Sequence, residues 1–389
     1  MTDFDKVIQR RGTNCIKWDL NPLKDRADVI PMWVADMDFE AAPGIINAMQ
    51  KVMDHKIFGY RFNSPEYKQV IIDWFKRRHN FEAAPEWICY LPNVVVGLSL
   101  AVQSVSEPGD EIILNTPVYG PFYKAVTDNH RVVKSCPMKE NDGYYTMDFE
   151  KMTSLVTEKT KAVMLCNPHN PGGRVWTREE LTKLADFCIE HQLYIISDDI
   201  HADLTLGDHV HTMIASISDE ISERCITCTS PSKAFNLAGM QAAHAFIKNE
   251  SLRERFMKPL NALHLSGGNS FEEALVIGAY RDSEEWLKEA VAYIEGNVDY
   301  FVDYIGEHIP QILAVKPEGT YLVWVDCRKL HMHQEQLLKF FMDQCHLFVN
   351  SGLDYGPEGE GFVRFNMACS RKLVEKAVRQ MEDGFKTLN

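Results

Sequence analysis

Two hydrophobic patterns alternate through the middle of the chain. Short apolar runs, typical of buried strands, occupy residues 111–115, 131–135, 161–166, 193–197 and 224–229. Segments with helical patterning lie at residues 119–128 and 177–191. The second begins at Thr177 and has Glu180 three residues later, which is the pattern of a helix capping box. This alternation predicts an α/β fold with a mainly parallel sheet.

The last quarter of the chain has its own set of predicted elements. A long helical segment at residues 283–308 is followed by shorter elements. These are predicted strands at 321–326 and 362–366 and predicted helices at 334–345 and 371–386. We therefore expect a large domain of residues 48–284, and a smaller α/β domain formed by residues 1–47 together with 285–389.

Three reactive side chains follow predicted strands. Asn170 lies in a Pro- and Gly-rich loop, Asp198 ends an apolar run, and Lys233 follows another. Because ligands of open α/β sheets bind beyond the carboxyl ends of the strands, we expect these three residues to lie close together.

Lys233 ends the tetrapeptide Ser230-Pro231-Ser232-Lys233. A lysine amine forms Schiff bases with aldehydes, and hydroxyl groups hold phosphates, so this grouping indicates a site for pyridoxal phosphate (PLP). A solvated lysine in a Ser-rich turn is the structural alternative.

Other residues suit the same cofactor, and each has an alternative. Asp198 needs a positive partner at the end of a buried strand, which a protonated pyridine nitrogen supplies; a turn-capping Asp is the alternative. Asn170 can donate to the ring oxygen, and Tyr119 can stack on the ring or be a core aromatic. Residues 93–97 precede a helix whose N–H groups can cradle a phosphate. Arg364 suits a substrate carboxylate or a surface ion pair.

Composition narrows the classes of function. The 389 residues include 41 Lys and Arg against 55 Asp and Glu, a net charge of −14, which argues against a nucleic-acid surface. We predict a cytoplasmic protein, because no signal peptide or membrane span is visible. The ten cysteines indicate reduced usage, and we expect Cys225 and Cys228 to be buried on opposite faces of a strand. A metal site at Asp198, Asp199, His201 and Asp203 is possible in principle, but their spacing is not that of metal ligands.

The ordered motifs resemble fold type I PLP enzymes, the aspartate aminotransferase-like fold. They are Asn-Pro-x-Asn-Pro-x-Gly at 167–173, Asp-x-x-His at 198–201, Ser-x-Ser-Lys at 230–233 and Arg-x-Asn at 364–366. Within that superfamily the chain resembles the MalY/PatB group of cystathionine β-lyases. The signature at 31–39, His201 in place of a usual Tyr, and Gln241 in place of a phosphate-binding Arg carry this resemblance.

The resemblance implies a role for each matched position. Lys233 is the Schiff-base lysine and catalytic base, Asp198 pairs with the pyridine nitrogen, and Tyr119 stacks on the ring. Asn170 and His201 surround the oxygen side of the ring. The phosphate meets Val95, Val96, Ser230 and Ser232, together with Tyr60 of a neighbouring subunit, which implies a homodimer. The substrate is bound by Arg364 and Asn170, with the backbone near Ala35 and Asp36.

The implied activity is β-elimination from L-cystathionine, L-cysteine or related S-substituted cysteines, giving thiol, pyruvate and ammonia. An aminotransferase is the alternative, since the motifs near Lys233 are shared by both reactions. A regulatory protein on the same scaffold is a third hypothesis, and a nicotinamide dehydrogenase is disfavoured because no G-x-G-x-x-G motif follows a strand.

Overall fold

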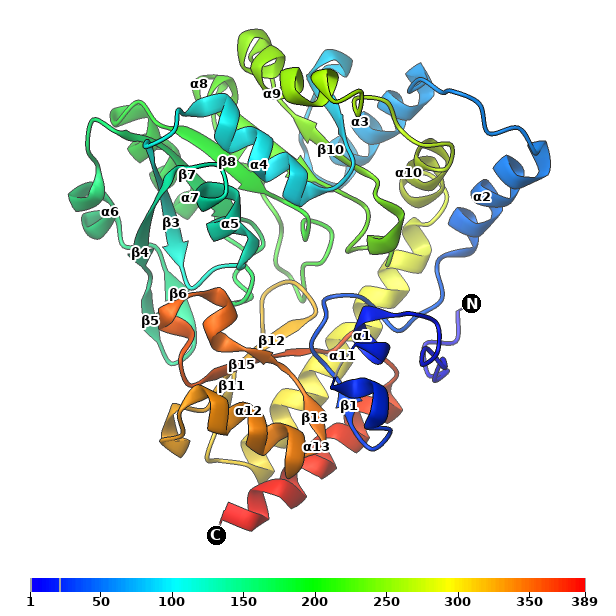
Figure 1. The fold of residues 1–389 in the computed structure, drawn as a ribbon, viewed down its shortest axis with the longest axis vertical. Helices are drawn as coiled ribbons and strands as arrows, with labels where there is room; N and C mark the ends of the chain where they lie inside the picture. The colour runs from blue at the N-terminus through cyan, green and yellow to red at the C-terminus, as the bar shows by residue number, and fades with distance from the viewer. Residues whose placement is uncertain (1, 21, 389) are drawn as a thin grey trace.

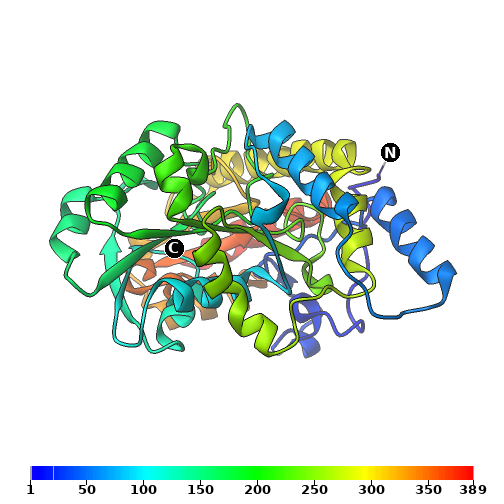
Figure 2. The same cartoon turned by 90° about the horizontal axis from the view of Figure 1, so that it is seen from above.

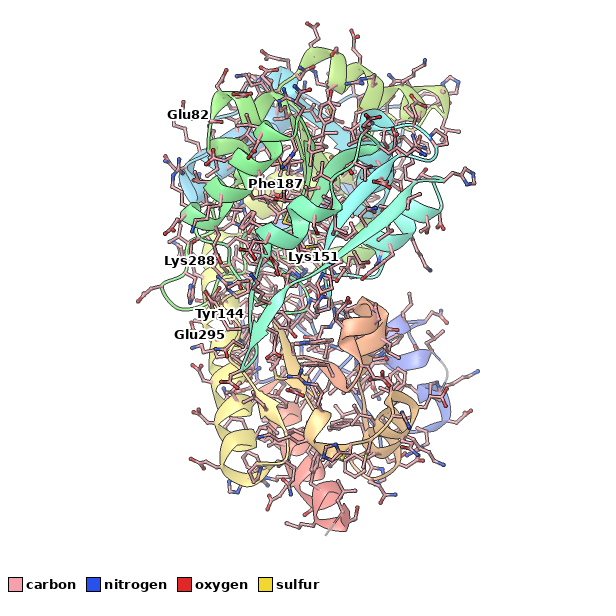
Figure 3. All side chains as sticks on the ribbon, turned by 90° about the vertical axis from the view of Figure 1, so that its left-hand side faces the viewer. Glu82, Tyr144, Lys151, Phe187, Lys288 and Glu295 are labelled. Atoms are coloured by element: carbon pink, nitrogen blue, oxygen red, sulfur yellow. The ribbon has the colours of Figure 1, made fainter. Side chains whose placement is uncertain are left out.

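The computed structural model describes residues 2–20 and 22–388, which form an upper and a lower part (Figure 1). A seven-stranded sheet with helices on both faces makes the upper part, and a four-stranded sheet lies in the lower part. The long helix α11 (Glu284–His308) runs from one part into the other. Figure 3 shows this from the side, with Lys288 and Glu295 of α11 labelled.

The seven-stranded sheet has the order β2-β10-β9-β8-β7-β3-β4. Its strands are β2 (Ile88–Leu91), β3 (Glu111–Thr116), β4 (Val132–Pro137), β7 (Thr160–Cys166), β8 (Tyr194–Asp198), β9 (Cys225–Thr229) and β10 (Ala243–Phe246). Strand β10 is antiparallel to both of its neighbours, and the five strands from β9 to β4 run parallel. The predicted α/β fold with a mainly parallel sheet is therefore confirmed.

Helices cover both faces of this sheet (Figure 2). They are α2 (Pro43–His55), α3 (Pro65–His79), α4 (Val94–Val105), α5 (Pro121–Thr127), α6 (Phe149–Leu155), α7 (Arg178–Glu190), α8 (Asp219–Glu223), α9 (Glu250–Ala262) and α10 (Glu272–Tyr280). Helices α4, α5 and α9 pack on one face, and α3, α7 and α10 pack on the other. Neighbouring strand residues such as Ile195 and Ile196 fill opposite cores, as the two-residue period requires.

The lower part has a sheet of order β11-β12-β15-β14 with antiparallel pairing. Its strands are β11 (Leu313–Ala314), β12 (Leu322–Asp326), β14 (Asn350–Ser351) and β15 (Phe362–Asn366). Smaller pairings join β1 (Ile30–Pro31) to β13 (Leu347–Phe348) and β5 (Lys139–Asn141) to β6 (Tyr144–Thr146). The remaining helices are α1 (Ile16–Asp19), α12 (Gln334–Asp343) and α13 (Arg371–Phe385). The predicted domain boundaries fall within α2 and α11, and the division into domains stays a prediction.

Two local predictions are confirmed at the level of single residues. Thr177 caps α7 and forms the full capping box with Glu180. Cys225 and Cys228 are buried in different cores on the two faces of β9, as their spacing predicted. Across the described part of the chain, no helix combines the length and apolar character needed to cross a membrane.

Candidate active site

A cavity of about 190 Å³ lies beyond the carboxyl ends of the parallel strands, and we call it the inner cavity. Predicted site residues from six segments line it: Ala35, Val95, Tyr119, Asn170, Asp198, His201, Ser230, Ser232 and Lys233. A second, more open cleft of about 780 Å³ shares Ala35, Tyr119 and Lys233 with it and also reaches Arg364. This second space is called the outer cleft.

Lys233 is the cation of the inner cavity. Its Nζ donates a hydrogen bond to the Ala35 carbonyl at 2.6 Å. Burial, helped by the charge of Arg364, lowers the pKa of Lys233 to about 8, against the opposing charges of Asp36 and Asp198. A buried lysine with this pKa has a neutral amine at mildly alkaline pH, which can act as a base or nucleophile.

Asp198 ends β8 and lies 3% exposed in the same cavity. Its carboxylate accepts a hydrogen bond from the Ile200 N–H at 3.2 Å. Burial raises the pKa of Asp198 to about 7, although the Ile200 N–H opposes that shift. Within the described residues no cation forms an ion pair with this carboxylate, so a cationic ligand group would satisfy it.

His201, Tyr119 and Asn170 form the walls near these charges. His201 is buried and its Nδ1 has no hydrogen-bond partner within residues 2–20 and 22–388. Burial lowers the pKa of His201 well below its ordinary value, and the charges of Lys233 and Arg364 add to this, so the ring is neutral. Tyr119 is tied to Asn170, because its N–H donates to the Asn170 carbonyl at 3.1 Å.

The start of α4 forms one end of the inner cavity. Asn93 caps this helix by accepting a hydrogen bond from the Val96 N–H at 2.9 Å. Val95 lines the cavity and Val96 does not, and the predicted phosphate contact of both residues stays a prediction. Gly97 allows α4 to approach the sheet closely: a Cβ there would lie 2.6 Å from Leu91 and 2.9 Å from the Cys228 sulfur.

The two serines have different roles at this end. Ser230 Oγ donates to the Ala242 carbonyl at 2.6 Å and accepts from the Ser232 N–H at 3.0 Å, so it shapes the turn that carries Lys233. The Ser232 hydroxyl makes no hydrogen bond to another described residue and lines the cavity. Neutral donors and a helix N-terminus together suit a phosphate.

Arg364 lies on β15 at the border of the outer cleft, 3% exposed. Its two Nη atoms donate to Asn170 Oδ1 at 3.0 Å, to the Trp33 carbonyl at 2.8 Å and to Asn350 Oδ1 at 2.7 Å. Its Nε is buried with no partner in the described part of the chain, and no described carboxylate pairs with the guanidinium. A buried, unpaired guanidinium is suited to a substrate carboxylate.

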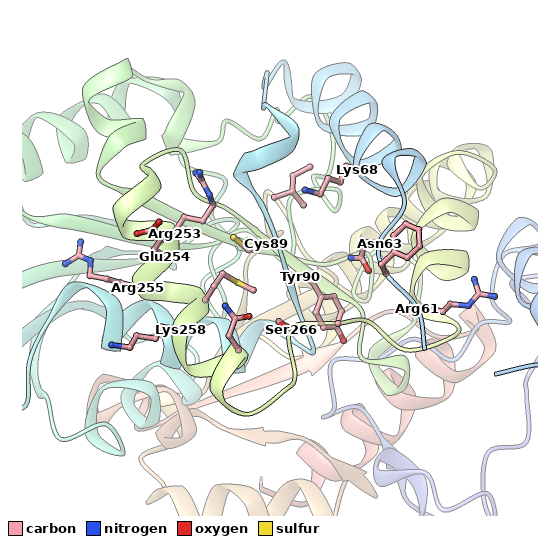
Figure 4. A pocket seen from close by; sticks show the side chains of 15 residues that line it. Arg61, Asn63, Lys68, Cys89, Tyr90, Arg253, Glu254, Arg255, Lys258 and Ser266 are labelled. Atoms are coloured by element: carbon pink, nitrogen blue, oxygen red, sulfur yellow. The ribbon is translucent and has the colours of Figure 1, made fainter. Parts of the chain in front are cut away.

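Two further predicted residues lie outside these cavities. Asp36 is bound to Arg10 at 2.7 Å, and its carbonyl accepts from Asn366 at 2.6 Å, so only the neighbouring Ala35 faces the site. Tyr60 is fully exposed and lines neither of the two cavities. It adjoins Arg61, which lines a large hollow of about 880 Å³ bordered by α9 (Figure 4).

The structure adds residues that the sequence did not indicate. Asn350 orients Arg364, and the Tyr321 hydroxyl donates to the Ala35 carbonyl at 2.9 Å. Tyr321 follows a Gly-Thr pair at a strand start, which was a usable signal, whereas Asn350 carried none.

The acidic residues considered as metal ligands have separate partners. Asp199 contacts His211 at 2.9 Å, and Asp203 contacts His79 at 3.0 Å. Among the residues that the structure describes, no group of three or more His, Cys, Asp or Glu side chains is placed to hold a metal ion.

Comparison with known proteins identifies the family. The family model "Aminotransferase class I and II" matches residues 27–381. The chain therefore belongs to the class I and II aminotransferases, and its fold is the aspartate aminotransferase-like fold type I.

The resemblance to the MalY/PatB group is also confirmed. The chain is 39% identical to the cystathionine beta-lyase PatB of Bacillus subtilis, over 98% of this chain and 99% of PatB. It is 34% identical to the protein MalY of Escherichia coli, over 97% of each chain. The solved structure of cystalysin from Treponema denticola, which contains a pyridoxal 5'-phosphate cofactor, superimposes with a TM-score of 0.95 at 35% identity and covers 100% of both chains.

The side chains of the inner cavity fit pyridoxal phosphate. The unpaired Asp198 carboxylate suits a protonated pyridine nitrogen, and Lys233 suits the aldehyde. The start of α4 and Ser232 suit the phosphate, and Tyr119 offers an aromatic wall.

Proposed function

We propose that this protein is a PLP-dependent carbon–sulfur β-lyase acting on S-substituted L-cysteines of the cystathionine type. The observation that carries the proposal is the meeting of Lys233, Asp198 and Arg364 around two joined cavities. Asp198 and Arg364 are buried, Lys233 is largely buried, and none of the three has an ion-pair partner among the described residues. The similarity to PatB over the full length favours the lyase over other reactions of the family.

The residues divide the reaction between them. When bound, PLP supplies an electron sink that stabilises negative charge at the substrate Cα. Arg364, oriented by Asn170 and Asn350, binds the substrate carboxylate. Lys233 removes the Cα proton, the Cβ–S bond breaks, and the electron pair leaves with sulfur, which becomes the thiol on protonation. Water then converts the remaining three-carbon fragment to pyruvate and ammonia.

The outer cleft supports a substrate with a long S-substituent. Its volume of about 780 Å³ far exceeds the need of the cysteine thiol alone. Lys124 and Asp354 line it beyond Arg364, and neither forms an ion pair within the described residues. Opposite charges placed there suit the carboxylate and ammonium of a second amino-acid head group, such as the far end of cystathionine.

We also propose that the working unit is a homodimer. Phe58, Tyr60 and Phe62, which lie in one segment of the chain, are all exposed, which leaves apolar side chains that water alone would cover. The adjoining hollow is lined by five basic side chains, Arg61, Lys68, Arg253, Arg255 and Lys258 (Figure 4). A second copy of this acidic chain complements that charge, and brings Tyr60 toward the phosphate end of its partner's site.

The first experiment measures pyruvate release from L-cystathionine by the purified, PLP-loaded protein without any oxo acid. We expect pyruvate and free thiol in equal amounts. No pyruvate, with amino-group transfer once an oxo acid is added, would show that the protein is an aminotransferase instead.

A further inference from the structure

Two donors meet on one carbonyl oxygen beside the inner cavity. The Tyr321 hydroxyl donates to the Ala35 carbonyl at 2.9 Å, and Lys233 Nζ donates to the same oxygen at 2.6 Å. A carbonyl oxygen has two lone pairs and can accept both bonds. Tyr321 is fully buried, and burial raises its pKa, so its hydroxyl stays protonated and keeps donating at every working pH.

The backbone before Tyr321 is held in an unusual conformation. Thr320 has φ of +72°, which is rare for a β-branched residue and persists only when its surroundings enforce it. The Thr320 N–H donates to the Leu204 carbonyl at 2.6 Å. A Cβ at Gly319 would lie 2.7 Å from Val175, so only glycine fits there. The strained segment therefore fixes the orientation of the Tyr321 side chain.

Tyr321 therefore contacts the site on two sides. Leu204 follows His201 by three residues, and the rings of His201 and Tyr321 lie 6.0 Å apart in an edge-to-face arrangement. On its other side the hydroxyl holds the Ala35 carbonyl. Tyr321 therefore sets the position of that carbonyl relative to the end of β8, where Asp198 stands.

We propose that Tyr321 is a positioning residue for Lys233: by holding the Ala35 carbonyl, it fixes the acceptor that orients the free lysine amine. A lysine amine on a flexible four-carbon chain is a well-directed base only when one of its N–H bonds has a fixed partner. The lone pair then faces the substrate Cα, from which the proton passes to Nζ while its electron pair stays on carbon. This inference rests on the proposed role of Lys233 as the base.

The test substitutes Tyr321→Phe, which removes only the hydroxyl and keeps the ring against His201. We expect kcat for β-elimination to fall about 10-fold while KM changes less than 2-fold. The deuterium isotope effect on kcat with Cα-deuterated substrate should increase, because proton removal becomes slower. Tyr280→Phe is the matched control, since the Tyr280 hydroxyl is equally buried and has no partner among the described residues. It should leave all three quantities unchanged.

A second readout needs neither cofactor nor turnover. In the cofactor-free protein, an amine-labelling reagent followed by peptide mass spectrometry reports how freely the Lys233 amine moves. We expect labelling of Lys233 to be at least 3-fold faster in Tyr321→Phe than in the wild type or in Tyr280→Phe. This arm remains decisive even if cystathionine proves not to be a substrate.

Thr320→Gly provides an independent variant if Tyr321→Phe does not fold. Glycine accepts a positive φ without strain, so this variant keeps the hydroxyl but loosens its direction. It should also label faster at Lys233 than the wild type. Labelling rates and isotope effects equal to those of the wild type in the folded variants would overturn the proposal, as would a fall in kcat with both of these unchanged.

Discussion

Two groups of charged residues lie next to Ala35 and are built in opposite ways. The N-terminal cluster consists of Arg10, Lys17, Asp36 and Asp38. Its member Asp36 directly follows Ala35 in the chain. In it Arg10 contacts Asp36 at 2.7 Å and Asp38 at 2.5 Å, and Lys17 contacts Asp38 at 2.7 Å. The site charges are Lys233, Asp198 and Arg364. They line the cavities that Ala35 also lines, and they form no ion pairs with the described residues.

Pairing rather than burial explains the difference in protonation. Lys17 and Lys233 are both buried, and burial alone lowers the pKa of each. In Lys17 the charges of Asp38 and Asp36 outweigh burial and raise the pKa, whereas the pKa of Lys233 falls to about 8. The two carboxyl groups also differ by pairing. Lys17 and Arg10 lower the pKa of Asp38 although it is buried, whereas burial raises the pKa of the unpaired Asp198 to about 7.

This comparison separates structural from functional charges. The N-terminal cluster satisfies its own members and fixes the segment that presents the Ala35 carbonyl. The site charges leave bonding capacity for a cofactor and a substrate carboxylate, at a cost in stability that the rest of the fold offsets. Each of the following substitutions tests one side of that difference.

Exchanging the two lysines for alanine gives the largest expected contrast. Lys233→Ala should reduce pyruvate release by about 10³-fold or more, because the base and the aldehyde partner are lost. At pH 7 the free energy of unfolding of the cofactor-free protein should rise rather than fall, because an amine whose pKa is lowered to about 8 is charged there at a cost in stability. Lys17→Ala should instead destabilise the protein by about 1.5–3 kcal/mol, because the buried Asp38 loses one of its two cations and a charged hydrogen bond.

Pyruvate assays and urea unfolding, both on the purified variants, measure this contrast. A Lys233→Ala protein with wild-type turnover would remove Lys233 from the mechanism. A Lys17→Ala protein as stable as the wild type would show that the N-terminal cluster does not hold the segment.

Asp198→Asn should separate stability from activity. A carboxyl whose folded pKa is raised from 3.8 to about 7 contributes stability that is fully present below pH 3.8 and is lost as pH rises to about 7. At pH 8 the cofactor-free variant should therefore be more stable than the wild type by ~1–4 kcal/mol, and at pH 4 the difference should nearly vanish. Turnover should fall at least about 100-fold, because an amide cannot pair as an anion with a protonated pyridine nitrogen.

Urea unfolding at several pH values measures the first effect. Asp38→Asn is the matched control and should be destabilised at pH 8, since its carboxylate is paired. Equal stability of wild type and Asp198→Asn at pH 8 would mean that the Asp198 carboxylate already has a partner in the cofactor-free protein.

Much of this organisation could be predicted because it depends on local patterns. The apolar run at 111–115 became β3, the Thr177 cap starts α7, and strand ends brought Asp198 and Lys233 to one cavity. The antiparallel strand β10 was missed, because its four residues, Ala243–Phe246, are identified as a strand only by their pairing with β2 and β9.

Other features of the site depend on which groups are already hydrogen-bonded or ion-paired within the protein. The sequence could not show that the Val96 N–H is used by Asn93, or that Asp36 belongs to the N-terminal cluster. Nothing in the sequence indicated Asn350, and the Gly-Thr pair before Tyr321 could not show which group its hydroxyl contacts, since both residues are brought to the site by packing between the upper and lower parts.

The smallest expected effect concerns Lys124 and Asp354 of the outer cleft, which like the site charges form no ion pair within the described residues, but are exposed to water. Because water screens them, each should contribute only about 0.2–1 kcal/mol to binding of the far head group of cystathionine. Lys124→Ala and Asp354→Ala should therefore raise KM for L-cystathionine about 2- to 5-fold, with kcat unchanged. S-methyl-L-cysteine has the same reacting end without a charged far end, and its KM should not change in either variant. An equal rise in KM for both substrates would mean that these residues shape the cleft rather than recognise a second head group, and no rise for either would place that head group elsewhere.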